Sequence, residues 1–307
     1  MKAVYMERTG GIEVLKYGDL PDPKPAAGEV VIDIHAASIN GADWKVRSGK
    51  DYPIAAFPYV LGRDFSGHVS ALGAGVTDFK VGDEVFGVCD VGQEGAYAEK
   101  IAVKAAIIAK KPASLSHVEA SALALVGLTA LVSVEDTLKL KPGETILVQG
   151  GAGGVAGFAI QTAKHIGARV ISTTSKGNLA YVKGLGADQV IDYAAEDFTK
   201  LVADCDAVFD TVGGEVATRS FSVLKPGGRA AFIASGPKAP AAPSTSVLSL
   251  RPAVKRDRPH LERIVELVKA AAVRIPEITT FPLKEAPEAQ RISEARHLRG
   301  KLVLKMR

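Results

Sequence analysis

The sequence predicts an α/β chain in which a doubly wound parallel sheet is joined to a second, β-rich domain. Three observations predict this fold. A glycine turn links a strand-like to a helix-like segment at residues 145–164, strand and helix patterns alternate after that turn, and residues 1–122 are rich in short strands and turns instead. At 307 residues, the chain is long enough for two separate cores.

The first part of the chain has the pattern of a β-rich barrel. Pro and Gly residues punctuate short strands at 3–7, 29–36 and 65–72, and residues 80–83 (Lys-Val-Gly-Asp) have the pattern of a tight turn. Two further strand-like segments near the end of the chain are too few to form a domain alone, so we expect them to rejoin the first one. The predicted domains are therefore 1–122 with 268–307, and 123–267.

The glycine turn is the most informative segment. A short apolar, β-branched run, Thr145 to Gln149, is followed by Gly151, Gly153 and Ala156, which fit the pattern G-x-G-x-x-G/A. In that pattern the first glycine makes the turn, the second admits a pyrophosphate, and the small third residue lets helix and strand pack closely. The alternative is an ordinary flexible turn between a strand and a helix.

The segments after the turn favour the dinucleotide-binding interpretation. Strand-like runs at 169–173, 189–192, 206–210 and 229–234 alternate with helical or turn segments, including a helix at 179–185. Alternation of this kind predicts a parallel sheet whose ligand lies at the carboxyl edge of the strands.

Composition excludes several classes of protein. The formal charge is only +4 with basic residues spread along the chain, so no nucleic-acid footprint is indicated; the one dense basic run, 251–258, is expected to be an exposed connection before a helix. Two isolated cysteines, Cys89 and Cys205, cannot build a disulfide framework, which fits a reducing cytoplasm. We find no leader peptide and no uninterrupted apolar run of about 18 residues, so we expect a cytoplasmic protein that does not bind membranes.

Several motifs together resemble one family. They are Ala37-Ser-Ile-Asn-Gly-Ala-Asp-Trp-Lys45, Leu61-Gly-Arg-Asp-Phe-Ser-Gly67, Val81-Gly-Asp-Glu-Val-Phe-Gly87, Gly127-Leu-Thr-Ala130, the glycine turn, Leu185-Gly-Ala-Asp188 and Gly300-Lys-Leu-Val-Leu304. In order and spacing the chain resembles the zinc-independent quinone oxidoreductases of the medium-chain dehydrogenase/reductase family. The resemblance implies a groES-like barrel, a Rossmann domain and an active site in the cleft between them. Ala156 departs from the glycine usual there, but alanine is also small.

The residues after the second strand of the dinucleotide domain predict the cofactor. An acidic residue there usually binds an unmodified ribose, and none is present in Ile171-Ser-Thr-Thr-Ser-Lys-Gly-Asn178. Hydroxyls, an amide and Lys176 suit a 2′-phosphate, so NADPH is expected rather than NADH. Alternatively, Lys176 is only a solvated residue at the start of a helix. The cofactor-binding residues implied by the turn and the resemblance are Thr129, Gly151, Ala152, Gly153, Gly154, Val155, Ser175, Lys176, Tyr193, Val212, Gly213 and Ser235.

No metal site is predicted. Zinc enzymes of the superfamily need a cysteine where this chain has Asn40-Gly-Ala-Asp43, and a His-Glu pair where it has Arg63-Asp64. The six histidines show no i, i+4 pair, so each is expected to be a surface or core residue. Without a Lewis acid, simple alcohol oxidation is not expected.

The predicted reaction is hydride transfer from NADPH to a quinone or an α,β-unsaturated carbonyl. The protein must then stabilise a developing oxyanion, and the resemblance places Asn40 and Lys45 in the loop that lines the site, with Tyr52 and Tyr59 as further donors. Asn40 could equally hold Asp43 or the backbone, Lys45 could be merely exposed, and water could supply the proton. Alternative functions are an enoyl-thioester reductase, anchored by the basic run, and a non-catalytic NADPH-binding redox sensor or structural protein.

The chain is also expected to form a homodimer. Residues 246–250 have the pattern of an edge strand of the Rossmann sheet, and such edges pair across two-fold axes.

Overall fold

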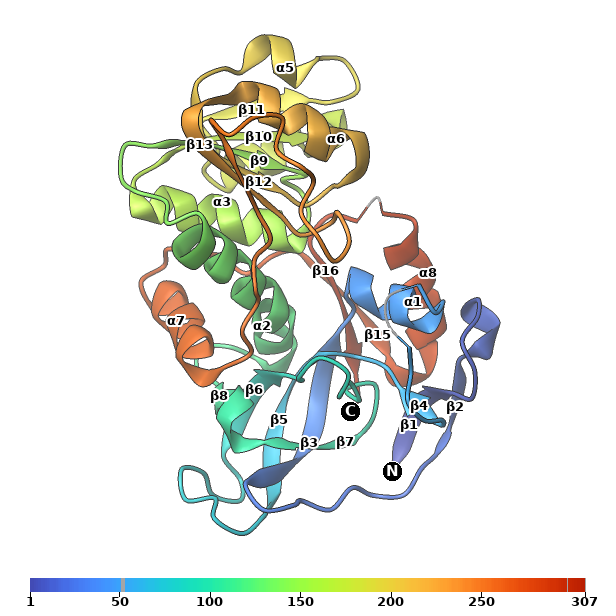
Figure 1. The fold of residues 1–307 in the computed structure, drawn as a ribbon. Coiled ribbons are helices and arrows are strands. Elements are labelled where there is room, and N and C mark those ends of the chain that lie inside the picture. The colour runs from blue at the N-terminus through green and yellow to red at the C-terminus, as the bar shows by residue number, and fades with distance from the viewer. Residues whose placement is uncertain (51–52, 297, 307) are drawn as a thin grey trace. The chain divides into compact units, whose positions relative to one another are not determined.

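The computed structural model describes residues 1–50, 53–296 and 298–306, which form two compact units (Figure 1). The first unit consists of Met1–Leu125, Arg256–Val265 and Ile275–Arg307, and the second of Val126–Lys255 and Glu266–Arg274. The predicted fold class, a Rossmann sheet with a groES-like β-rich domain, is confirmed.

The first unit contains a seven-stranded and a three-stranded sheet. The large sheet has the order β15-β16-β3-β5-β6-β8, with β7 paired to β3, and the small one has the order β2-β1-β4. The strands are β1 (Lys2–Met6), β2 (Lys16–Asp19), β3 (Glu29–Ser38), β4 (Tyr59–Val60), β5 (Asp64–Leu72), β6 (Glu84–Val88), β7 (Lys100–Lys104), β8 (Ile108–Lys110), β15 (Ile278–Pro282) and β16 (Lys301–Lys305). The two C-terminal strands join this unit, with β16 antiparallel to β3.

Alternation along the strands explains the core of this unit. In β3, Val30, Ile32 and Ile34 are fully buried, and they pack with Phe65 of β5 in the main apolar cluster. Strand side chains alternate between faces, so every second residue from Val30 to Ile34 reaches this apolar cluster.

Two short helices of the first unit, α1 (Gly41–Arg47) and α8 (Ala286–Glu294), contact each other.

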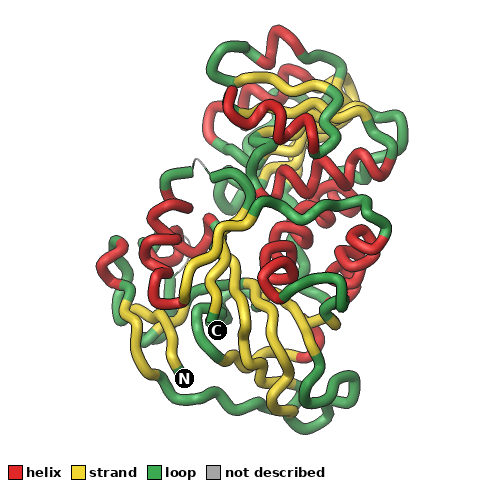
Figure 2. Tube along the Cα trace, turned by 180° about the vertical axis from the view of Figure 1, so that it is seen from behind, coloured by secondary structure: helices red, strands yellow, loops and turns green. Residues whose placement is uncertain are grey.

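The second unit contains a six-stranded parallel sheet with helices along it, drawn in red in Figure 2. The strands are β9 (Thr145–Gln149), β10 (Arg169–Thr174), β11 (Gln189–Asp192), β12 (Cys205–Asp210), β13 (Leu224–Phe232) and β14 (Leu248–Leu250), and the helices between them are α3 (Gly154–Ile166), α4 (Leu179–Gly184), α5 (Phe198–Leu201) and α6 (Gly214–Arg219). Numbered along the sequence, the order β11-β10-β9-β12-β13-β14 is 3-2-1-4-5-6, the Rossmann order. Its switch point lies between β9 and β12.

The basic run 251–258 differs from the exposed connection expected there. Arg256 donates to the carbonyl of Cys89, and Arg258 donates to the carbonyls of Ile108 (3.1 Å) and Ala105 (2.8 Å). These guanidinium groups bond backbone carbonyls of the first unit, and residues 256–265 belong to that unit, although the sequence pattern predicted them in the dinucleotide domain. Arg258 begins α7 (Arg258–Lys269), the helix expected after the run.

The helical segment 117–137 is long and apolar enough to cross a membrane by length and composition, although Glu119, Glu135 and Asp136 interrupt its apolar run. It comprises α2 (His117–Leu131) and a π-helical turn, Val132–Thr137. However, 78% of its most apolar window is buried inside the structure, as in a core helix.

Candidate active-site residues

The predicted turn lies between β9 and α3, at the carboxyl edge of the parallel sheet. The left-handed residue of the turn is Gly150, with φ of +80°, one position before the glycine to which the sequence pattern assigned the turn. Gly151 is needed for space instead, because a Cβ there would lie 2.3 Å from the Ser172 hydroxyl and 2.9 Å from Val182 Cγ1. Both positions require glycine, for different reasons.

The start of α3 offers an open set of backbone donors. Gly153 is the N-cap residue, and the first intrahelical bond runs from the Gly157 amide to the Gly153 carbonyl at 2.8 Å. The amides of Gly154, Val155 and Ala156 precede that bond, as expected for the first turn of a helix. A Cβ on Gly153 would meet only the Gly150 carbonyl oxygen, at 3.5 Å, so the space above this turn is open.

The end of β10 carries the residues expected at a 2′-phosphate. Ser175 caps a short 3₁₀ turn, Lys176–Asn178, and its hydroxyl accepts a hydrogen bond from the Asn178 side chain at 3.1 Å. Lys176 is exposed, and no described residue forms an ion pair with it. Tyr193, at the end of neighbouring β11, is 56% exposed, and its amide donates to the Thr174 carbonyl.

Strand β12 ends in a second glycine turn. The buried Asp210 carboxylate accepts from the amides of Val212 (3.2 Å) and Gly213 (2.9 Å). Gly213 has φ of +82°, and a Cβ there would lie 2.7 Å from the Ala234 carbonyl oxygen, so this turn packs tightly against the segment after β13. Burial raises the pKa of Asp210, and its two amide bonds oppose that shift.

Ser235 adds an unusual feature to the same edge. Its hydroxyl oxygen is buried and has no hydrogen-bond partner among the described residues. A buried polar atom without a partner costs free energy unless a ligand or water satisfies it. The residues named for the cofactor thus meet at the carboxyl ends of β9 to β13, except Thr129, which lies in α2 with its carbonyl bonded to the Ser133 hydroxyl at 2.6 Å.

In the first unit, Asn40 is at the centre of a buried polar network. Its side-chain amide donates to Asp64 Oδ1 (2.8 Å) and to the Ser38 carbonyl (3.3 Å), and its Oδ1 accepts from Lys301 Nζ (2.8 Å). Asn40 also forms a reciprocal capping box with Asp43 at the start of α1. Both side-chain N–H groups are used. The structure therefore gives Asn40 the role of holding the loop, one of the two roles considered for it.

A second buried network surrounds Asp43. The Tyr97 hydroxyl donates to Asp43 Oδ2 at 2.6 Å, while Asp43 Oδ1 is buried with no partner among the described residues. Burial raises the pKa of Asp43 to about 7, against the attraction of Arg63. Burial likewise raises the pKa of Asp64 and lowers that of Lys301, although the two groups attract each other.

The remaining predicted donors have different surroundings. The Tyr59 hydroxyl donates to Glu94 Oε2 at 2.9 Å, and Arg63 Nε donates to Glu94 Oε1 at 2.6 Å. Lys45 is half-buried in α1 with its ammonium 5.8 Å from the Trp44 ring centroid. Tyr52 lies outside the described residues.

Comparisons with known proteins agree with this geometry. The alcohol dehydrogenase GroES-like domain model matches residues 26–113, and the zinc-binding dehydrogenase model matches residues 185–304. The chain is 32% identical to a chloroplast envelope quinone oxidoreductase homolog of Arabidopsis thaliana, over 98% of this chain and 96% of that protein. It is 33% identical to the NADPH-dependent alkenal/one oxidoreductase of the same plant, over 99% and 79%.

A solved structure gives the same result. Escherichia coli quinone oxidoreductase complexed with NADPH superposes with a TM-score of 0.90 at 28% identity, covering 99% of this chain and all of the other. The chain belongs to the quinone oxidoreductases of the medium-chain dehydrogenase/reductase family. A nicotinamide cofactor is therefore expected at the carboxyl edge described above.

At Arg63 and Asp64, where the sequence comparison placed the metal-binding pair of the zinc enzymes, the side chains are bonded within the protein. Arg63 has no lone pair to give a metal and is bonded to Glu94. Asp64 accepts two hydrogen bonds from the Ser38 hydroxyl, at 2.8 and 2.9 Å, as well as the Asn40 amide. The donor set at these positions does not fit a zinc ion.

Sequence reasoning missed Asp64, Tyr97, Glu94 and Lys301 in the first unit and Asp210 in the second. Lys301 lies 261 positions from Asn40, and the only indication in the sequence was that its strand was expected to rejoin the first domain. Asp210 was predicted only as the last residue of a strand. An Asp at a strand end just before a Gly-Gly turn often accepts hydrogen bonds from the amides of that turn, and this signal could have indicated its role.

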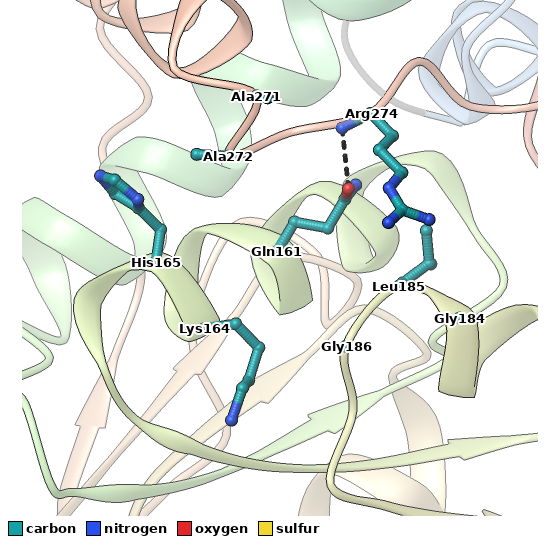
Figure 3. A pocket seen from close by; sticks show the side chains of 9 residues that line it. All are labelled: Gln161, Lys164, His165, Gly184, Leu185, Gly186, Ala271, Ala272 and Arg274. Carbon is teal, nitrogen blue, oxygen red and sulfur yellow. Dashed lines mark hydrogen bonds between the residues drawn. The ribbon is translucent and has the colours of Figure 1, made fainter.

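A hollow of about 290 Å³ in the second unit is not part of this edge (Figure 3). It lies beside the C-terminal half of α3 and is lined by Gln161, Lys164, His165, Gly184, Leu185, Gly186, Ala271, Ala272 and Arg274. Gln161 accepts from the Arg274 amide at 2.8 Å, and Lys164 is bonded to Asp188. Two of its polar side chains, Gln161 and Lys164, are thus already engaged, and it lies away from the glycine turn.

Proposed function

We propose that the protein is an NADPH-dependent oxidoreductase that reduces quinones or α,β-unsaturated carbonyls without a metal ion. The observation that carries the proposal is the carboxyl edge of the Rossmann sheet, where an open glycine turn lies beside a strand end with Ser175 and Lys176 and no acidic residue. The relatives that are quinone and alkenal/one oxidoreductases support the substrate class.

The residues at this edge fit a dinucleotide. Gly153 leaves room for a pyrophosphate, the first amides of α3 can donate to it, and the unpartnered Ser235 hydroxyl can bond the cofactor. The bound nicotinamide supplies a hydride to an electron-poor carbon of the acceptor.

NADPH rather than NADH is the proposed cofactor because of the charge at the end of β10. Lys176 is exposed without an ionic partner among the described residues, and Ser175 presents a hydroxyl beside it. An exposed ammonium with a neighbouring hydroxyl suits a phosphate dianion, whereas an unmodified ribose is usually held by a carboxylate.

On the acceptor side, the protein must stabilise a developing enolate or phenolate oxygen. Asn40 has no N–H group to spare, and the Tyr59 hydroxyl donates to Glu94. We propose Lys45, which the family resemblance places at the site and whose ammonium carries three N–H groups, as the donor to this oxygen. The Asn40 network fixes the start of α1, the helix that carries Lys45.

The alternative functions have less support. An enoyl-thioester reductase would use the basic run to anchor a carrier phosphate, but Arg256 and Arg258 are bonded to carbonyls of this chain. A non-catalytic NADPH-binding protein would not turn over any acceptor, so it is an outcome of the test below.

The test is turnover with a panel of acceptors. We expect NADPH oxidation with quinones and alkenals, none with enoyl thioesters, no appreciable oxidation of simple alcohols, and unchanged rates after treatment with chelators. Lys45→Ala should lower kcat by a factor of about 10² to 10³ at little cost to NADPH affinity. Rapid alcohol oxidation, or no turnover with any conjugated acceptor, would overturn the proposal.

We also propose that the protein is a cytoplasmic homodimer that binds neither nucleic acid nor membranes. Cys89 and Cys205 are both free and buried, which suits a reducing compartment. Strand β14 is the edge of the parallel sheet and pairs on one side only, with β13. An unpaired strand edge is a ready partner for a second copy of itself.

A further inference from the structure

Three histidines that are far apart in the sequence meet on the large sheet of the first unit. His35 lies on β3, His68 on β5, and His117 at the start of α2. Their ring centroids are 4.4 Å (His35–His117), 4.6 Å (His35–His68) and 5.0 Å (His68–His117) apart. One ring nitrogen of each lies within 4.8 Å of one ring nitrogen of the other two.

A β-bulge places His35 in this group. Ile34 pairs with Gly67 and Ala36 with Ser66, so His35 is an extra residue in β3 opposite β5. Bulges redirect a side chain at the expense of regular pairing. The neighbouring pair is regular, with His68 opposite Asp33 of β3 and opposite Glu84 of β6.

The hydrogen bonds around His117 leave one of its nitrogens with an unused lone pair. The Ser66 hydroxyl donates its only hydrogen to the Val85 carbonyl at 2.8 Å, so it must accept from His117 Nδ1, also at 2.8 Å. The Nε2 atom of the neutral ring is then an acceptor, and it is buried with no hydrogen-bond partner among the residues that the structure describes.

A carboxylate lies close to this lone pair. The Glu84 carboxylate oxygen Oε1 lies 3.4 Å from His117 Nε2 and 3.6 Å from His68 Nε2. On its other side, His68 Nδ1 is 2.9 Å from His35 Nε2. A divalent cation bound by these rings would satisfy the unpartnered His117 Nε2 and would be attracted by the Glu84 carboxylate.

We propose that His35, His68 and His117 bind one divalent transition-metal ion of the zinc class, with Glu84 as the neighbouring carboxylate. Imidazole nitrogens are the ligands such ions favour. Metal–nitrogen bonds of about 2.0–2.1 Å in a tetrahedral site put ligand nitrogens roughly 3.3 Å apart, which small side-chain rotations achieve from the present spacing. This assigns a ligand role to histidines that the sequence placed among surface or core residues.

The surrounding residues supply the outer contacts of such a site. The Ser66 hydroxyl accepts from His117 Nδ1 and so leaves His117 Nε2 for the metal. When His68 binds the metal through its Nδ1, its ring proton lies on Nε2, which faces the Glu84 carboxylate. Outer hydrogen bonds of this kind orient metal-binding histidines. The positive charge of Lys111 opposes the binding of a cation here. Lys111 is paired with the other Glu84 oxygen at 3.1 Å, so the negative charge of Glu84 offsets that repulsion.

The site is separate from the proposed reaction, since none of its residues belongs to the Asn40 network or to the carboxyl edge of the parallel sheet. The proposal therefore does not depend on the proposed function. Removing the metal should leave turnover with NADPH and a quinone unchanged. Loss of turnover on metal removal would contradict the separation of the two sites.

The test is calorimetric titration of the chelator-treated full-length protein with zinc chloride at about pH 7.5, above the ordinary histidine pKa of about 6.5. We expect one zinc per chain. His68→Ala, which removes a partly exposed ring, and the double variant with His117→Ala should weaken binding at least about 100-fold, and Glu84→Gln by about 10- to 100-fold.

His165→Ala is the matched control, because His165 is an exposed histidine of the second unit, and it should bind zinc as the unaltered protein does. Thermal unfolding without metal checks that each variant is folded. Unchanged zinc binding in folded His68→Ala, loss of binding in His165→Ala, or no saturable binding by the unaltered protein would each overturn the proposal.

Discussion

At the scale of single residues, burial decides the roles of the polar side chains. Asn40 was named as an oxyanion donor, yet both of its N–H groups are bonded inside the protein. Lys176 shows the opposite situation, since its exposed ammonium lacks an ionic partner among the described residues. A side chain whose hydrogen bonds are complete supports the site, and one with open capacity is able to bind a ligand.

Replacing Ser175 and Lys176 together with Ala should weaken NADPH binding and leave NADH binding nearly unchanged. A hydrogen bond to a charged group contributes about 1.5–3 kcal/mol, and the 2′-phosphate is the only part that distinguishes the two cofactors here. Fluorescence titration with each cofactor measures this. Lys200→Ala, an exposed lysine of α5, serves as the control, and equal losses for both cofactors would refute the assignment.

Asp43 predicts a pH dependence of stability. Its pKa is raised to about 7 by burial, above the unfolded value of about 3.9. The folded protein therefore binds an extra proton between these values, and the stability that this provides is full below about pH 4 and is lost as the pH rises through about 7. The loss is at most about 4 kcal/mol for a shift of about three units.

In Asp43→Asn this loss should disappear, because the amide keeps the oxygen that Tyr97 and Asn40 bond and has no proton to lose. Urea unfolding at several pH values should show the variant gaining stability relative to the unaltered protein from about pH 4 to 7. Asp22→Asn is the control, since the pKa of the exposed Asp22 is lowered to about 2 by Lys100 and the N-terminus. If the free energy of unfolding of Asp43→Asn changed with pH in the same way as that of the unaltered protein, the prediction would be wrong.

At the scale of elements, the β9–α3 turn uses its glycines for different purposes. Gly150 supplies the left-handed conformation, Gly151 permits close packing against β10, and Gly153 leaves open space at the start of α3. Only Gly150 and Gly151 are required by the fold. A substitution of Gly153 can therefore change cofactor binding without a large change in stability.

Gly153→Ala should weaken binding of either nicotinamide dinucleotide while changing the free energy of unfolding by no more than about 0.5 kcal/mol. The added methyl group meets only the Gly150 carbonyl within the protein, at 3.5 Å, but occupies the space of the pyrophosphate. Gly151→Ala should instead destabilise the fold by about 1–3 kcal/mol. Gly184→Ala, whose methyl group would meet nothing within 4 Å, is the control for both measurements. Normal cofactor affinity in Gly153→Ala would place the pyrophosphate elsewhere.

At the scale of the whole molecule, the exposed edge of the parallel sheet is the basis of the proposed dimer. β14 is short, and Leu248 on it is 53% exposed. A charged side chain on an edge strand discourages pairing between copies. Leu248→Lys should therefore convert the proposed dimer to a monomer in sedimentation velocity experiments, whereas Val81→Lys, at an exposed apolar residue of the first unit, should not. A monomeric unaltered protein would remove the basis of this proposal.

The sequence by itself determined the Rossmann sheet, because strand and helix periodicity and glycine turns are local patterns that survive without knowledge of tertiary contacts. It also predicted that most residues named for the cofactor lie at one edge of that sheet, since parallel strands bring their carboxyl ends together. Only the tertiary structure decided that Lys301 bonds Asn40, that Arg256 and Arg258 belong to the first unit, and that His35, His68 and His117 meet. These contacts join residues tens to hundreds of positions apart, and no local periodicity records which distant side chains a fold brings within hydrogen-bond distance.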